Sequence, residues 1–119
     1  MAQDLPAFQR VLEALESARS VASILIATLD TTTQETDDQD CYPRGIELYI
    51  ERDDPVWHSL RFLSKHLDWI NLDTRTKHLY IQPPESIPFR NTQAHFQQEV
   101  ALSLNHSGIY CAPHVYYRE

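Results

Sequence analysis

The sequence predicts a single α+β domain, in which a mixed or antiparallel sheet of about four strands is covered by about three helices. Three observations lead to this fold class. The chain has 119 residues, of which 42% are hydrophobic, and this is enough for one buried core but leaves little room for a second. Segments with helical spacing of apolar residues alternate with strand-like segments. No repeat, low-complexity tract or linker divides residues 1–119.

The first helix is predicted to begin at Asp4, whose side chain can cap it, with Pro6 in the opening turn. Its apolar face has helical spacing: Phe8, Val11, Leu12, Leu15 and Ala18. We place its end near Ser20 and predict a strand over residues 21–29, because β-branched side chains favour strands and are frequent there. The competing interpretation is one helix of about 25 residues, since apolar residues continue the same spacing to Leu29.

Residues 30–44 are predicted to form a polar acidic loop. They hold five acids, three consecutive threonines and Pro43, and they lack apolar periodicity. Residues 46–51 alternate between apolar and polar side chains and therefore predict a strand with one wet face. If residues 21–29 pair with this strand, the acidic loop is the long connection of a hairpin, and loops of such length are often functional or disordered.

The second helix is predicted over residues 54–70, with Asp53 or Asp54 as its cap, Pro55 in its first turn and an end near Asn71. No glycine or proline interrupts the segment after that turn. Its main apolar stripe follows the i, i+4, i+7 pattern: Val56, Leu60, Leu63, Leu67 and Ile70.

One more helix and two more strands complete the predicted order. Residues 77–82 indicate a short strand that is ended by two consecutive prolines. A helix is predicted from Asn91 or Thr92 to about Gly108, because glycine favours the end of a helix. Residues 109–117 are strand-like, with a break at their internal proline.

The charge is acidic overall and uneven along the chain. The net charge is −7, and residues 1–54 carry twelve acids and four bases, whereas residues 55–119 carry five acids and six bases. Nucleic acid is therefore not a predicted partner, because phosphate binding needs clustered Lys and Arg. We expect a protein partner with a basic surface, steered by Asp37, Asp38 and Asp40. The competing interpretation is that the charge serves solubility alone.

The sequence predicts a cytoplasmic protein without a membrane span. It opens with neither a basic lead nor a long apolar stretch, so no secretory signal is expected. The most apolar run, at residues 21–29, is roughly half of the ~20 residues that a membrane helix requires. Cys41 and Cys111 are expected to be reduced thiols rather than a disulfide pair.

No cofactor, metal or catalytic residue is predicted. Gly45 and Gly108 are the only glycines, so the chain has no glycine-rich loop that could cradle a phosphate. Four residues offer nitrogen or sulfur ligands for zinc: Cys41, His106, Cys111 and His114. Their spacing lacks the tight C-x-x-C pairing of structural zinc sites. No local pattern pairs a nucleophile with a base and an orienting group.

A second face of the predicted helix at residues 54–70 is aromatic and polar. At about 100° per residue, Phe62 and Trp69 point away from the main apolar stripe, and His58 and Lys65 lie beside them. Aromatic rings among adaptable polar groups are typical of the centres of protein interfaces. The competing interpretation is that the helix lies between the sheet and another element, which would bury both faces.

These observations favour a non-catalytic protein that binds another protein as an adaptor, inhibitor or specificity factor. The predicted protein-binding residues are His58, Phe62, Lys65, Trp69, Asp37, Asp38 and Asp40. The alternative is a small-molecule-binding domain or small enzyme with a pocket between sheet and helices. The polar groups of that pocket would be His78, Tyr80, His95 or the cluster at residues 106–114. A homodimer through the aromatic face is compatible with either function.

Overall fold

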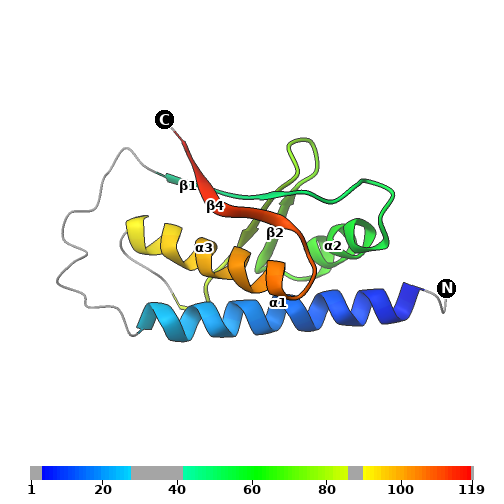
Figure 1. The fold of residues 1–119 in the computed structure, drawn as a ribbon, viewed down its shortest axis with the longest axis horizontal. Helices are drawn as coiled ribbons and strands as arrows, with labels where there is room; N and C mark the ends of the chain where they lie inside the picture. The colour runs from blue at the N-terminus through cyan, green and yellow to red at the C-terminus, as the bar shows by residue number, and fades with distance from the viewer. Residues whose placement is uncertain (1–3, 28–41, 86–89, 119) are drawn as a thin grey trace.

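The computed structural model describes residues 4–27, 42–85 and 90–118, which form three helices and one four-stranded antiparallel sheet (Figure 1). This arrangement confirms the predicted α+β class. The elements follow in the order α1 (Asp4–Ala27), β1 (Tyr42–Leu48), α2 (Pro55–His66), β2 (Ile70–Asp73), β3 (His78–Ile81), α3 (Arg90–His106) and β4 (Cys111–Arg118).

The sheet has the strand order β2-β3-β1-β4, so the first strand of the chain lies inside the sheet and the last lies at an edge. Ile46 of β1 is paired with Leu79 of β3 on one side and with Val115 of β4 on the other. Burial alternates along β3, where Leu79 and Ile81 are buried while His78 and Tyr80 are partly exposed. One face of this hairpin strand therefore lines the core and the other faces outward.

The helices form two layers on one side of the sheet. α3 packs against β1, β3 and β4, and the main contacts of α1 are with α3 and α2 (Figure 1). α1 runs antiparallel to α3 along the outer side of the molecule (Figure 1). Large, almost fully buried side chains from every layer meet in the core: Val11, Leu15, Ile46, Trp57, Leu60, Ile70, Leu79, Ile81, Phe96, Val100 and Leu104.

The predicted break of the first helix at Ser20 and the strand after it are wrong, because α1 continues without interruption to Ala27. The competing prediction of one long helix is the correct one. Ala18 and Ala22 are completely buried one helical turn apart, where α1 packs against α3, whereas Val21 is 43% exposed. Tertiary packing thus overrides the strand preference of the β-branched residues. The hairpin expected from this strand does not form.

β1 begins and ends earlier than the predicted strand at residues 46–51, since it covers Tyr42–Leu48. The predicted acidic loop at residues 30–44 therefore overlaps β1 at residues 42–44, and residues 28–41 lie outside the described residues. Gly45 marks a shift in the β1–β4 register and has a φ of +137°. A Cβ atom at this position would lie 2.9 Å from the carbonyl oxygen of Leu79, so the close approach of β1 to β3 requires glycine.

α2 begins as predicted but ends well before Asn71. The Asp54 carboxylate accepts a hydrogen bond from the Val56 backbone N–H at 2.8 Å, which identifies Asp54 as the cap. Leu67 is already extended, and the chain turns and enters β2 at Ile70, a strand that the sequence did not predict. Leu67 and Ile70 continue the helical spacing of apolar residues. The periodicity therefore predicted a helix where the chain turns and enters a strand.

α3, β3 and β4 lie close to their predicted positions. Gly108 has a φ of +87° after the end of α3, and the Ile109 N–H donates to the Leu104 carbonyl at 2.9 Å. β4 is one strand through Pro113, but its pairing with β1 is irregular at the predicted break, because the register shifts between the Leu48–Cys111 and Ile46–Val115 pairs. β4 is an edge strand, and an edge tolerates proline because an outward-facing position needs no N–H donor. None of the described helices combines the length and apolar character needed to cross a bilayer.

A buried amide extends the hydrogen bonding of the sheet into α3. Gln97 is completely buried, and its side chain accepts from the Ile81 N–H at 3.1 Å and donates to the Ile81 carbonyl at 2.6 Å. Ile81 lies beyond the β1–β3 ladder, which pairs residues 46 and 47 with residues 79 and 78. The Gln97 amide therefore takes the place of a neighbouring strand at the end of β3.

Candidate functional site

Besides Pro55 at the start of the helix, α2 exposes five residues, which we call the α2 face: His58, Arg61, Phe62, Lys65 and His66. They have the spacing i, i+3, i+4, i+7 and i+8, which places them along one side of a helix. The opposite side is buried against the rest of the domain through Val56, Trp57, Ser59, Leu60 and Leu63. The α2 face is thus the solvent side of a well-anchored amphipathic helix.

Two residues of this face, Phe62 and His66, form an aromatic cluster with Phe8 of α1. The ring of Phe62 meets that of Phe8 edge-on, with centroids 5.2 Å apart, and stacks on the imidazole of His66 at 4.1 Å. The Nδ1 atom of His66 lies 2.9 Å from the Phe62 carbonyl oxygen, which fixes the imidazole on the ring. Phe62 nevertheless remains 49% exposed, so a large apolar surface is held in a defined position in water.

The rest of the α2 face is cationic. α2 contains Arg61 and Lys65 but no Asp or Glu, although the whole chain has a net charge of −7. Within the described residues, neither of these two side chains forms an ion pair or a hydrogen bond through its charged group. The face can therefore offer two permanent charges and two imidazoles to a molecule that covers Phe62.

The underside of α2 is anchored by Trp57, which is 2% exposed. The Arg52 guanidinium carbon lies 5.4 Å from a Trp57 ring centroid, and the Lys77 ammonium nitrogen lies 5.9 Å away. Arg52 also donates to the backbone carbonyls of Thr74 at 2.6 Å and Arg75 at 3.2 Å, in the turn between β2 and β3. α2 and the β2–β3 hairpin are thus held together around one indole ring.

The structure brings together three of the four residues predicted from the helix: His58, Phe62 and Lys65. Trp69 does not join them, because α2 ends at His66 and the indole lies under the Arg19 guanidinium, 4.7 Å from the ring centroid. Phe8 and Arg19 are eleven residues apart on α1, which corresponds to about 16 Å along the helix axis. The prediction that one helix face carries both Phe62 and Trp69 is therefore wrong.

The sequence analysis did not identify three residues at or beside the α2 face, namely Arg61, His66 and Phe8 of α1. The helical spacing from His58 would have identified Arg61 and His66, whereas Phe8 reaches the cluster only through tertiary packing. The predicted acidic binding residues lie outside the described residues: Asp37, Asp38 and Asp40.

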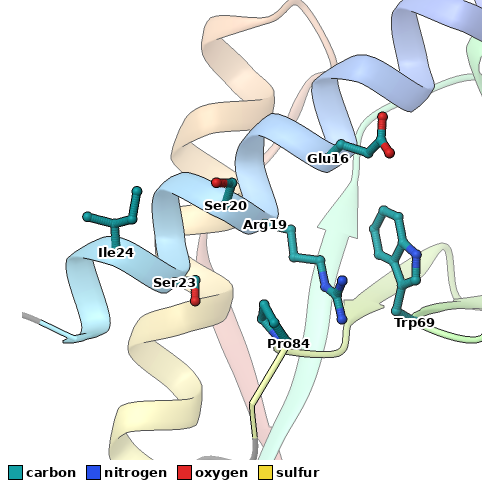
Figure 2. A pocket seen from close by; sticks show the side chains of 7 residues that line it. All are labelled: Glu16, Arg19, Ser20, Ser23, Ile24, Trp69 and Pro84. Carbon is teal, nitrogen blue, oxygen red and sulfur yellow. The ribbon is translucent and has the colours of Figure 1, made fainter.

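A pocket of about 320 Å³ lies beside Trp69, and its walls come from α1, the segment after β3 and the turn before β2 (Figure 2). It is lined by Glu16, Arg19, Ser20, Ser23, Ile24, Trp69 and Pro84. The Arg19 side chain extends between Pro84 and Trp69, and its Nε donates to the Gln82 carbonyl at 2.8 Å (Figure 2). Because Arg19 already links α1 to this segment, we assign it a structural role.

A second pocket, of about 300 Å³, lies on the β2–β3 hairpin and is lined by Asn71, Leu72, Asp73, Thr76, His78 and Tyr80. Asn71 pairs with Tyr80, and Asp73 with His78, across the two strands. The alternative prediction from the sequence was a pocket between sheet and helices. This one instead includes the outward-facing side chains of β3, while His95, the third predicted polar group, is exposed on α3 and is not part of it.

The titrating groups of the hairpin pocket have different charge states. The Thr76 hydroxyl and the backbone N–H groups of Thr76 and Arg75 donate to Asp73, and these hydrogen bonds lower the pKa of its carboxyl. Burial raises the pKa of Tyr80. The pocket therefore presents an ionised carboxylate beside a neutral phenol near neutral pH.

Of the four candidate zinc ligands, Cys41 lies outside the described residues, and only His106 and Cys111 have described side chains. His106 is exposed, whereas Cys111 is buried and its thiol donates to the Ala101 carbonyl at 3.4 Å. Burial raises the pKa of Cys111 to about 12, so the thiol stays protonated at neutral pH and is a poor nucleophile. Within the described part of the chain, no three His, Cys, Asp or Glu side chains are grouped to hold a metal ion.

Comparisons with protein-family models, with curated proteins and with solved structures found no significant match.

Proposed function

We propose that this protein is a non-catalytic, cytoplasmic protein-binding module, acting as an adaptor, inhibitor or specificity factor, and that the α2 face is its contact surface. The observation that carries the proposal is the half-exposed Phe62 ring, held between Phe8 and His66. Aromatic residues that are fixed in place and surrounded by polar side chains contribute most of the binding energy in many interfaces. A partner that covers Phe62 would remove this ring from water.

The anchoring of α2 also supports the proposal. The Asp54 cap, the buried Trp57 and the aromatic stacking fix the helix and the Phe62 side chain before any partner arrives. A surface that is already ordered loses little conformational entropy on binding, and more of the contact energy then appears as affinity.

The proposal predicts that Phe62→Ala abolishes partner binding while the protein remains folded. The ring is only half-buried, so its removal should lower the free energy of unfolding by about 1 kcal/mol. The measurement uses a photo-crosslinking phenylalanine analogue at position 62 in the native host, with mass analysis of the adduct. Tyr110, which is 63% exposed beyond the end of α3, provides the matched control position.

A second polypeptide, or a second copy of this chain, should crosslink through position 62 and not through position 110, and Phe62→Ala should lose this partner in a pull-down. Equal crosslinking at both positions, or none at position 62, would contradict the proposed surface. The acidic residues Asp37, Asp38 and Asp40 remain a proposed contact for basic surfaces of a partner.

A small-molecule-binding function at the β2–β3 pocket is the second candidate. The observation that favours it is the grouping of Asp73, His78 and Tyr80 around one cavity of about 300 Å³. A thermal-shift screen of small polar molecules tests it, because a ligand at one hundred times its Kd adds about 2.7 kcal/mol of stability. A true ligand should stabilise the wild type and a His95→Gln control but not Tyr80→Phe. A ligand that stabilises all three proteins equally would exclude this pocket as its site.

A further inference from the structure

We infer that the segment docking on the α2 face is an acidic protein segment, with clustered carboxylates around one apolar side chain. This inference rests on the proposed function and adds the chemistry of the partner. The apolar side chain would cover Phe62, and the carboxylates would meet Arg61 and Lys65 beside it.

Several cations of the described residues are used within the fold. Arg19 donates to the Gln82 carbonyl and lies on Trp69, and Arg52 donates to two carbonyls of the β2–β3 turn. Lys77 lies near Trp57. Arg61 and Lys65 have no such contact within the described residues. Their charges are therefore available to a partner without the loss of an internal interaction.

The placement of Arg61 and Lys65 also favours an anionic partner. They are four residues apart, so they lie one turn apart on the same side of α2, and like charges at this spacing repel each other. Phe62 lies next to both, and His58 and His66 extend the face at its two ends. A carboxylate between the two cations would relieve their repulsion, and the Arg61 guanidinium can bind it through two parallel hydrogen bonds.

A protein segment fits this surface better than a nucleic acid does. The α2 face has only two permanent cations, whereas phosphate backbones are held by larger clusters of Lys and Arg. The exposed carboxylates Asp53 and Asp68 precede and follow α2, and the chain as a whole carries a net charge of −7. A continuous polyanion crossing the helix would meet this repulsion, whereas a short acidic segment would be confined to the face.

The test is a titration of the isotope-labelled full chain with three synthetic probes, followed by NMR. The probes are a Glu-rich peptide with one central leucine, the same peptide with Gln in place of each Glu, and a single-stranded RNA. We expect the Glu peptide to shift the signals of residues 58–66 and the Gln peptide to bind at least about tenfold more weakly. Added salt should weaken the binding of the Glu peptide and leave the binding of the Gln peptide nearly unchanged.

Matched charge variants locate the effect. The double variant Arg61→Gln, Lys65→Gln should weaken binding of the Glu peptide by about tenfold, because two charge pairs are lost. The control pair Arg10→Gln, Arg75→Gln removes the same charge from exposed positions on α1 and in the β2–β3 turn and should change binding by less than about twofold. Phe62→Ala should also weaken the binding of the Glu peptide, because the apolar contact is lost.

Four results would overturn the inference: equal binding of the Glu and Gln peptides, equal losses in the two charge variants, no loss with Phe62→Ala, or tighter binding of the RNA at the same residues. Absence of any peptide binding would overturn it as well. None of these results would remove a protein crosslink at position 62, so the proposed function is tested separately from the acidic character of its partner.

Discussion

Replacing Gln97 with leucine is expected to lower the free energy of unfolding by about 2–4 kcal/mol. Leucine has a similar size, so the loss arises from hydrogen bonding rather than from a cavity. The Gln97 amide bonds both backbone groups of Ile81, and all of these atoms lie in the core between α3 and the sheet. Without the amide, a buried N–H and a buried carbonyl have no partner in place of the missing strand.

Urea denaturation of the purified variant measures this loss, and Gln98→Leu is the matched control. Gln98 is the next residue on α3, is only partly buried and has no side-chain hydrogen bond within the described residues, so its replacement should change the free energy of unfolding by less than about 0.5 kcal/mol. Similar losses in the two variants would show that the Gln97–Ile81 pair does not carry this stability.

Trp57→Ala is expected to lower the free energy of unfolding by about 3–5 kcal/mol, which is the largest effect of any single truncation in α2. The indole is 2% exposed and lies where α2 meets the β2–β3 hairpin, next to Arg52 and Lys77. Its removal leaves a cavity and also ends the two cation–ring contacts. Because the α2 face depends on the orientation of α2, the same change should weaken binding through Phe62.

Thermal unfolding of Trp57→Ala and of Trp69→Ala provides the comparison. Trp69 also lies beneath an arginine, but it is only partly buried. Its truncation should therefore lower the free energy of unfolding by roughly half as much or less. Trp57→Phe, which retains most of the apolar volume, should recover part of the stability. A Trp57→Ala protein as stable as Trp69→Ala would contradict the anchoring role assigned to the buried indole.

The fold class and most elements were predictable because their signals are local. The Asp54–Pro55 start of α2, the alternation around Leu79 and the glycine after α3 each act within a few residues. The region after Ser20 was not predictable in this way. Its β-branched residues favour a strand whereas its apolar spacing favours a helix, and the burial of Ala18 and Ala22 where α1 packs against α3 decides for the helix.

The candidate site was predictable only in part, for the same physical reason. Periodicity placed His58, Phe62 and Lys65 on one face. This prediction is correct because all three residues lie within the twelve residues of α2. Trp69 was placed wrongly because apolar spacing continues past the true end of α2. Phe8 could not be found from spacing, since its contact with Phe62 joins residues that are far apart in the sequence.

The central position of β1 determines when the sheet can be completed during protein synthesis. β1 is the first strand to be made, yet one of its two neighbours is β4, at residues 111–118. At roughly 5–20 residues per second, the nascent chain spends several seconds with that side of β1 unpaired. An unpaired strand edge is a template for association with other chains. That edge of β1 is therefore open to association until β4 emerges and completes the sheet.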